Sequence, residues 1–407
     1  MPTAVILNLP EHGHLNATFP LVSELVKRGE RVIYYATEPH RDRIEAAGAE
    51  FRSYGEARAF EPPAHQGGLY SVMAHLIQLT EAVLPRLIGE LEQDRPDYLL
   101  IDSMCVWGRL VQQITGLPAA TLASVFVPDE TTVSVEEMVR LAYGRAPKEV
   151  LLAGVDALNT YIEVSQRIDH RYGTLSPNIV EFFANRQPLN IVFTSREFHP
   201  MGDRYDDSYK FVGPSIAARH DTPDLNFDAS DTRPLIYISL GTIFNDQPEF
   251  YRNCFEALAD SPYRVVLATG SKVDAGSLTA PANFCVRPYV PQLPVLSQAS
   301  VFLTHCGMNS ASEALWYGVP LVMFPQHGDQ HLVASRVAEA GAGLMLPPGD
   351  AGPAQIRALV DQAHSDPAFR HNAQRIGESF RAAGGYRRAA EEILAFTAEA
   401  HPCRQSA

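Results

Sequence analysis

The chain has 407 residues, 46% of them hydrophobic and 20% charged, so it holds enough apolar material for two globular domains. Its formal net charge of −14, from 33 Lys and Arg against 47 Asp and Glu, argues against nucleic acid as the main partner. Five scattered cysteines without a C-x-x-C pair argue against a disulfide framework or a metal site and favour a reducing compartment. The N-terminus resembles no signal peptide and no apolar run reaches membrane-spanning length, so we expect a cytoplasmic protein without membrane insertion.

The first half alternates strand and helix patterns, which is typical of a doubly wound domain. The expected strands are 4–9, 31–36, 51–54, 96–102, 118–127 and 189–195. The expected helices are 17–28, 38–48, 69–91 and 106–115, the third of them interrupted near Pro85. Residues 128–183 show no strand pattern and are expected to be helical.

Two polar side chains follow strands of this expected sheet. His14 lies in the polar segment 10–16, which we expect to be a loop, and Asp102 ends the strand 96–102. Because parallel strands end at one edge of a sheet, both side chains are expected there. Histidine can accept a proton at neutral pH, and an aspartate on its other nitrogen would fix its tautomer. Taken alone, His14 could instead cap the following helix, and Asp102 could be a turn residue.

The second half begins a new series of strands and helices after a polar stretch. Residues 215–234 are rich in Asp and Pro and are the expected linker. Strand 235–240 is followed by Gly241 and Thr242, and residues 353–400 are mostly helical. The predicted division is a first domain 1–214, a linker 215–234, a second domain 235–380 and a helical tail 381–407 that could pack back on the first domain. No G-x-G-x-x-G follows a strand, which counts against a nicotinamide dinucleotide site.

Residues 301–330 are the most informative stretch. Two apolar strand patterns, 301–303 and 319–324, flank a helical pattern at 311–317, so the polar loops 305–310 and 327–330 are expected at one sheet edge. Helix amides and a dipole at the first loop suit a phosphate, and the carboxylate and carboxamide of the second suit sugar hydroxyls. Together they indicate a nucleotide sugar. Ser310 and Glu313 also have the spacing of a capping box, and Asn309 could be only a turn residue.

The sequence HCGMNSxxE followed by GVPLVMFPQHGDQ resembles the donor-binding signature of family 1 glycosyltransferases, in the bacterial macrolide-type branch of the UDP-glucosyl/glucuronosyltransferase superfamily. The resemblance implies an α/β GT-B fold, in which two Rossmann-like domains face each other across a cleft. It assigns the diphosphate, the ribose and the sugar hydroxyls to residues of this stretch and to the two residues after the strand 235–240. These are His305, Gly307, Asn309 and Ser310 for the diphosphate with Gly241 and Thr242, Glu313 for the ribose, and Asp329 and Gln330 for the sugar.

The segment 286–292 resembles the W-x-P-Q segment of the family, with Tyr289 where plant relatives have tryptophan. The resemblance places the nucleotide base against Tyr289, Val290 and Gln292. A phenol ring can still stack on uracil, with less area. The donor is therefore expected to be a UDP-sugar, and Asp329 with Gln330 favours glucose.

Residues 10–16, PEHGHLN, resemble the G-H-x-N loop of the family, whose histidine is the general base. Asp102 matches the supporting acid, and Ala17 replaces the proline common after the asparagine. The implied reaction is a direct displacement with inversion, in which His14 deprotonates a hydroxyl of the acceptor, without a metal or other cofactor. The acceptor is expected to be a lipophilic small molecule, such as a macrolide, another polyketide, a flavonoid or another phenol. Its candidate contacts, from the ranges 56–80 and 124–165, are Tyr70, Met73, His75, Phe126, Met138 and Tyr143.

Two alternative functions stay open at this point. A GT-B nucleotide-sugar epimerase or hydrolase would use the same donor signature. A non-catalytic sugar-nucleotide-binding protein would also use it, although such a protein needs neither His14 nor Asp102.

Overall fold

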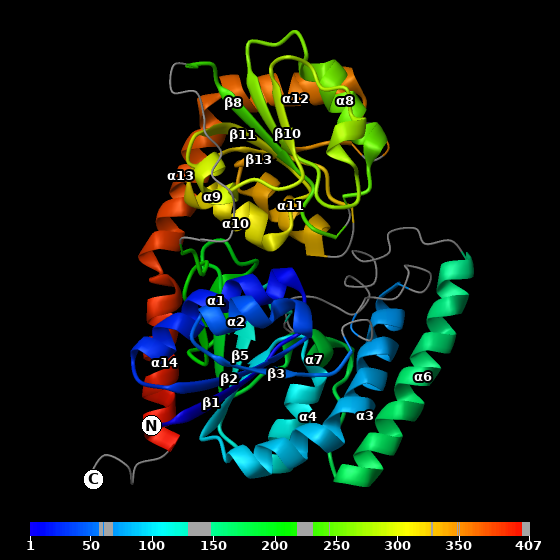
Figure 1. Ribbon diagram of the computed structural model, residues 1–407, viewed down its shortest axis with the longest axis vertical. Coiled ribbons are helices and arrows are strands. Elements are labelled where there is room, and N and C mark those ends of the chain that lie inside the picture. Colours follow the sequence, from blue (N-terminus) through cyan, green and yellow to red (C-terminus); the bar gives the residue numbers. More distant parts are fainter. Residues whose placement is uncertain are drawn as a thin grey trace. The chain divides into compact units, whose positions relative to one another are not determined.

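The computed structural model describes residues 1–56, 60, 68–128, 148–217, 231–243, 245–326, 329–347, 349 and 351–400. The chain forms two compact units (Figure 1), Met1–Ser215 with Ala383–Ala407, and Ile216–Ala382. It leaves the first unit at Ser215, where the predicted linker starts, and returns to it at Ala383. Within the described part of the chain, no helix is both long and apolar enough to cross a bilayer.

The first unit is built on a parallel sheet of seven strands in the order β3-β2-β1-β4-β5-β6-β7. These strands are β1 (Thr3–Leu7), β2 (Arg31–Ala36), β3 (Glu50–Ser53), β4 (Tyr98–Asp102), β5 (Ala119–Ala123), β6 (Leu189–Val192) and β7 (Tyr209–Phe211). The helices and 3-10 turns are α1 (His12–Lys27), η1 (Glu38–His40), α2 (Arg41–Ala46), α3 (Gly68–Asp94), α4 (Val106–Thr115), α6 (Lys148–Tyr172), α7 (Ile179–Ala184), η3 (Gly202–Arg204) and α14 (Gly385–Ala400).

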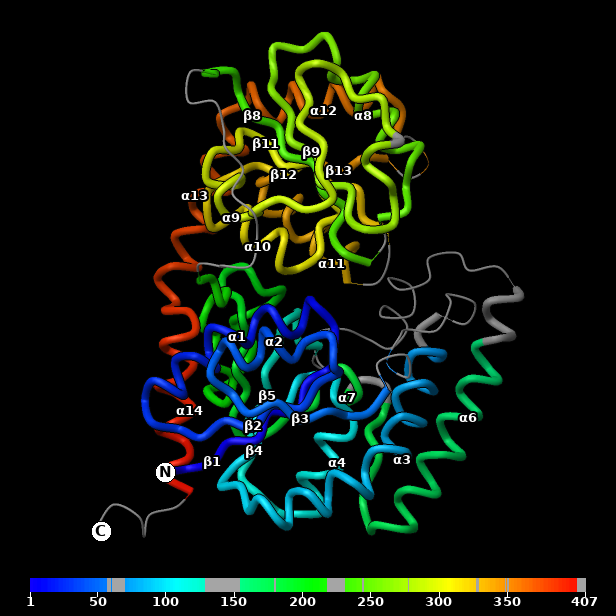
Figure 2. Tube along the Cα trace, in the orientation of Figure 1, coloured from blue at the N-terminus to red at the C-terminus, as the bar shows by residue number. Residues whose placement is uncertain are grey.

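Helices cover both faces of this sheet, which explains why its strands are apolar on both sides. Alternate residues of β1 belong to two separate cores. Leu7 packs in the core that contains Trp107 of α4, and Ile6 packs in the core that contains Leu21 of α1 and Ile393 of α14. Figure 2 shows α14, in red, running beside α1. The C-terminal helix thus completes the core of the first unit.

The second unit has a parallel sheet of six strands in the order β10-β9-β8-β11-β12-β13. These are β8 (Leu235–Ser239), β9 (Arg264–Ala268), β10 (Phe284–Arg287), β11 (Ala299–Thr304), β12 (Leu321–Met323) and β13 (Gly343–Met345). The helices and the 3-10 turn are α8 (Pro248–Leu258), η4 (Ala275–Ser277), α9 (Gln292–Leu296), α10 (Met308–Trp316), α11 (Asp329–Glu339), α12 (Pro353–Ser365) and α13 (Pro367–Ala382).

The structure corrects three expectations from the sequence. Helix α1 begins at His12 rather than Ala17, because Glu11 is its extended N-cap and accepts backbone bonds from His14 and Leu15. Helix α3 continues through Pro85, which is exposed, so its ring is accommodated on the solvent side of the helix at the loss of one backbone hydrogen bond. The three-residue strands β7 and β13 were not predicted, since so few residues carry no periodicity.

Candidate active site

His14 and Asp102 meet at the carboxyl edge of the seven-stranded sheet. His14 lies in the first turn of α1, directly after β1, and Asp102 is the last residue of the neighbouring β4. His14 Nδ1 is 2.7 Å from Asp102 Oδ2, and both residues are buried. The second carboxylate oxygen of Asp102 accepts the backbone N–H of Met104 at 2.9 Å. With both oxygens engaged, the carboxylate holds the imidazole in the tautomer that carries a hydrogen on Nδ1.

Two residues that the sequence analysis missed support this pair. Ser124, directly after β5, places its Oγ 3.1 Å from His14 Nδ1. Asn185 donates from Nδ2 to the backbone carbonyl of Asp102 at 3.1 Å, and it has a positive φ of 39° that is unusual for a side chain other than glycine. No sequence signal singles out Asn185, because it is 83 residues away from its partner.

The predicted diphosphate residues gather at the carboxyl edge of the six-stranded sheet. The imidazole of His305 is partly buried between Gly241 and Gly307, and a Cβ at either glycine would lie 2.6 Å from the ring. Gly241 also has φ +76°, so this position requires glycine on two grounds. Burial lowers the pKa of His305 to about 4, and a hydrogen bond to the Ser239 backbone opposes this only in part. The ring is neutral at pH 7 and acts as a dipolar donor or acceptor.

Helix α10 begins with Gly307 as its N-cap, and no side chain caps it. Asn309 and Ser310 are its second and third residues, so Ser310 is not the N-cap of a capping box with Glu313. Glu313 Oε2 instead accepts from Gln292 Nε2 at 2.7 Å, and Gln292 Oε1 accepts from Tyr237 at 3.0 Å. This hydrogen bond connects Glu313, which is predicted to bind the ribose, with Gln292, which is predicted to contact the base. The start of α10 presents backbone amides at the position where an anion would bind.

The other predicted donor residues lie nearby in the second unit. Asp329 and Gln330 open α11, and Gln330 accepts the Gln326 backbone N–H at 2.9 Å. Asp329 acts electrostatically on Cys306, so the start of α11 lies near the loop after β11. Tyr289 is 54% exposed and Val290 is buried. Thr242 is exposed in the loop after β8.

Four of the six predicted acceptor residues are described, three of them on α3 and one in the segment after β5. Met73 is almost wholly buried in the core of the first unit, and partly buried Tyr70 packs against that core. His75, also on α3, is partly exposed, and Phe126 packs against His199. Met138 and Tyr143 lie outside the described residues.

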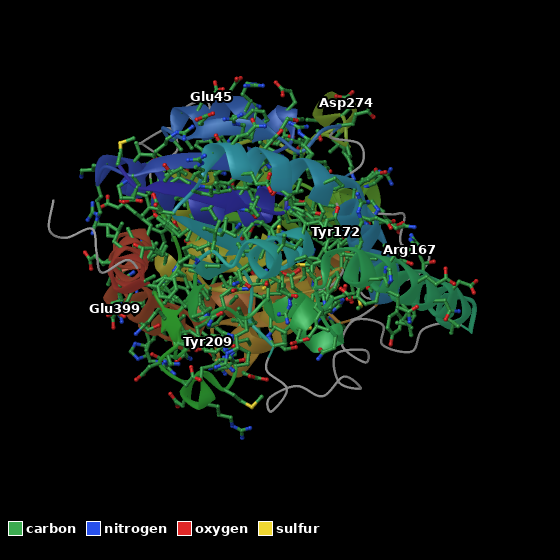
Figure 3. The ribbon with its side chains drawn as sticks, turned by 90° about the horizontal axis from the view of Figure 1, so that it is seen from below. Glu45, Arg167, Tyr172, Tyr209, Asp274 and Glu399 are labelled. Atoms are coloured by element: carbon green, nitrogen blue, oxygen red, sulfur yellow. The ribbon has the colours of Figure 1, made fainter. Side chains whose placement is uncertain are left out.

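Helices α3 and α6 pack side by side in the first unit (Figure 1). Arg167 of α6, labelled in Figure 3, forms two hydrogen bonds of 2.9 Å with Glu81 of α3. The contact is exposed and joins two helices of the first unit.

Comparison with known proteins identifies the class. Residues 252–393 match the family described as erythromycin biosynthesis protein CIII-like, C-terminal domain. The crystal structure of CalG4, the calicheamicin glycosyltransferase, superposes with a TM-score of 0.82 at 29% identity, covering 99% of this chain and 100% of that one. The fold is therefore GT-B.

Two relatives of similar length show to which family the chain belongs. The NDP-glycosyltransferase YjiC of Bacillus licheniformis is 36% identical over 97% of this chain and 98% of its own length. The oleandomycin glycosyltransferase of Streptomyces antibioticus is 28% identical over 96% of this chain and 90% of its own length. The chain belongs to the macrolide-type branch of the GT-B glycosyltransferases and is a nucleotide-sugar-dependent transferase.

Proposed function

We propose that the protein is an inverting O-glycosyltransferase that moves a hexose, glucose foremost, from a UDP-sugar to a hydroxyl of a lipophilic small molecule. The observation that carries the proposal is the 2.7 Å contact between His14 Nδ1 and buried Asp102. A protein that only bound the nucleotide sugar would have no use for a buried carboxylate on a histidine. Relatives named for oleandomycin and calicheamicin support a natural product as the acceptor.

In the proposed reaction, His14 takes the proton of the acceptor hydroxyl on Nε2, because Nδ1 already binds Asp102. The oxygen then attacks the anomeric carbon from the face opposite the diphosphate. A single displacement inverts the configuration, so an α-linked donor gives a β-glycoside. Asp102 stabilises the imidazolium that forms, and it keeps its own negative charge throughout the step.

The leaving diphosphate would be bound by the amides at the start of α10, by the neutral ring of His305 and by the loop after β8. Exposed Tyr289 would stack on the uracil, and Glu313, held by Gln292, would bind the ribose. Asp329 and Gln330 would bind the sugar hydroxyls, and Thr242 would add a hydroxyl at the diphosphate. In this proposal no metal takes part, because amides and dipoles stabilise the leaving group.

The proposal is tested with purified protein, UDP-glucose and a panel of macrolide, flavonoid and simple phenol acceptors. We expect a product heavier by one hexose, detected by mass spectrometry, at a rate that EDTA does not lower. NMR of the anomeric proton should show a β-linkage. Consumption of UDP-glucose that is independent of any acceptor would favour the hydrolase or epimerase instead. UDP binding without turnover of the donor would favour a binding protein.

A further inference from the structure

The proposed mechanism gives no role to the contact between Ser124 and His14. We propose that Ser124 is a positioning residue for the base, and that its hydroxyl oxygen shares the Nδ1 hydrogen of His14 with Asp102. The inference rests on the proposed function, in which His14 is the base. It concerns how that base is oriented.

The sheet places Ser124 where it can reach His14. Strands β1, β4 and β5 are neighbours, and Asp102 pairs in register with Leu122 of β5. Ser124 therefore lies two residues beyond the partner of Asp102, at the same edge. Its Oγ is 3.1 Å from the same nitrogen that Asp102 Oδ2 approaches to 2.7 Å. Two oxygens thus meet one ring nitrogen.

One nitrogen with one hydrogen limits what the two oxygens can do. The shorter, charge-assisted bond goes to Asp102, so Nδ1 carries the hydrogen and Ser124 can only accept a weaker, shared bond. In the other tautomer, the Nδ1 lone pair would face a carboxylate at 2.7 Å, and Nε2 would carry a hydrogen and could not act as a base. Asp102 therefore selects the tautomer. Ser124 adds a second anchor that restricts rotation of the ring.

The backbone on both sides of Ser124 is held firmly, which makes such a role physically reasonable. The Ala123 carbonyl accepts the N–H of Phe193 at 3.0 Å. Three residues after Ser124, the Val127 N–H donates to His199 Nε2 at 3.0 Å, and the Val127 carbonyl accepts the hydroxyl of Tyr205. Ser124 itself is only 5% exposed. A side chain on such a segment can orient its neighbour at little further entropic cost.

Steady-state kinetics with UDP-glucose tests the inference. Ser124→Ala should lower kcat about tenfold, as expected for one hydrogen bond to a charged group, and leave the KM for UDP-glucose within about twofold. The acidic limb of the pH profile of kcat/KM should move to lower pH, because an oxygen that stabilises the imidazolium is gone. Ser103→Ala is the matched control, since the buried Ser103 hydroxyl has no partner among the described residues. That control should keep full activity.

A pair of isosteric variants separates the hydroxyl from packing. Ser124→Thr keeps the oxygen and Ser124→Val replaces it with a methyl group of similar volume. We expect the threonine variant to be about tenfold more active than the valine variant, even if the added bulk slows both. Equal activity of the two, full activity of Ser124→Ala, or a loss confined to the KM for UDP-glucose would each overturn the inference.

A measurement without turnover keeps this inference distinct from the proposed function. In protein labelled with ¹⁵N-histidine, the His14 signals should report hydrogen on Nδ1, and Ser124→Ala should shift or broaden them while Ser103→Ala does not. Unchanged His14 signals in Ser124→Ala contradict the inference, whether or not the enzyme transfers sugar. A wild-type chain that shows the expected ring signals but transfers no hexose would instead contradict the proposed function alone.

Discussion

The two sheet edges of this protein have similar topology but different chemical character. At the edge of the first sheet, buried side chains bind one another, with His14 between Asp102 and Ser124. At the edge of the second sheet, backbone geometry dominates, with Gly241 in a left-handed conformation, a helix start without a side-chain cap, and a histidine whose pKa is far below 7. The first arrangement suits the movement of a proton. The second suits the binding of an anion without an ionised side chain, and the following variants test this contrast.

The largest effect is expected from His14→Ala. Removal of a general base should lower kcat by about 10²- to 10⁴-fold, while UDP should still raise the melting temperature as it does for the wild type. The variant would thus remove the proposed base at the edge of the first sheet and leave the predicted donor-binding residues at the edge of the second sheet unchanged. Retention of most of the transfer activity would show that His14 is not the base, and a lost response to UDP would show that the two edges are not separable.

Gly241→Ala should damage the second edge through its backbone. The new Cβ would lie 2.6 Å from the His305 ring at φ +76°, so we expect the KM for UDP-glucose to rise about tenfold or more. Gly349→Ala is the matched control, because Gly349 has the same φ of +76° and no atom within 4 Å of the added Cβ. Both variants bear the cost of a left-handed alanine, roughly 1–2 kcal/mol, but only the first displaces His305. Equal KM values for the two would refute the assignment of Gly241.

The neutral state of His305 predicts a pH dependence of stability. Because its pKa falls from 6.5 to about 4 on folding, the unfolded chain binds more protons between these values, and the folded state is destabilised as the pH drops through this window. His305→Gln cannot titrate and should lack this contribution. Between pH 7.5 and pH 5 the wild type should lose at most about 2 kcal/mol more of its free energy of unfolding than the variant, since the ring is partly exposed. Urea denaturation of the wild type and of His305→Gln at both pH values measures the difference. If the two proteins lose the same free energy of unfolding, folding does not lower the pKa of His305.

The last variants concern the contacts of Val127, three residues after Ser124, with His199 and Tyr205. His199→Phe keeps a ring among Phe126 and Phe211 but leaves the Val127 N–H buried without its acceptor, which should cost about 1–3 kcal/mol of the free energy of unfolding. Tyr205→Phe removes a donor to the Val127 carbonyl and should cost about 1 kcal/mol. Thermal and urea unfolding of the two variants give the comparison. A His199→Phe chain as stable as the wild type would show that this contact does not hold the segment in place.

Much of the architecture could be predicted from the sequence because parallel strands buried on both faces are continuous apolar runs, such as LLI before Asp102. Since such strands end at one edge, a histidine after the first and an aspartate after a later one could be expected together. Whether the two strands are neighbours, and whether the side chains touch, depends on the strand order, which local patterns do not determine.

What could not be predicted has identifiable physical causes. Apolar periodicity marks the body of a helix and misses polar first turns, so α1 and α10 begin five and three residues before their expected starts. That error placed His14 in a loop, although it lies in the first turn of α1, and it made Ser310 look like an N-cap. Ser124 gave no signal because it fell inside the expected strand 118–127, whereas β5 ends at Ala123. Asn185 gave no signal because its partner, the backbone carbonyl of Asp102, lies 83 residues earlier in the chain.

Helix α14 has a consequence for how this protein is made. Ala389, Ala390 and Ile393 are wholly buried in a core whose other members come from the first two hundred or so residues of the chain. The second unit, by contrast, is a single continuous segment. On the ribosome, the second unit therefore has its entire sequence available before the first unit does, and α1 lacks its covering helix until the segment that follows the second unit has been made. A chain that stops at residue 382 would expose this apolar face, and we expect it to aggregate during expression.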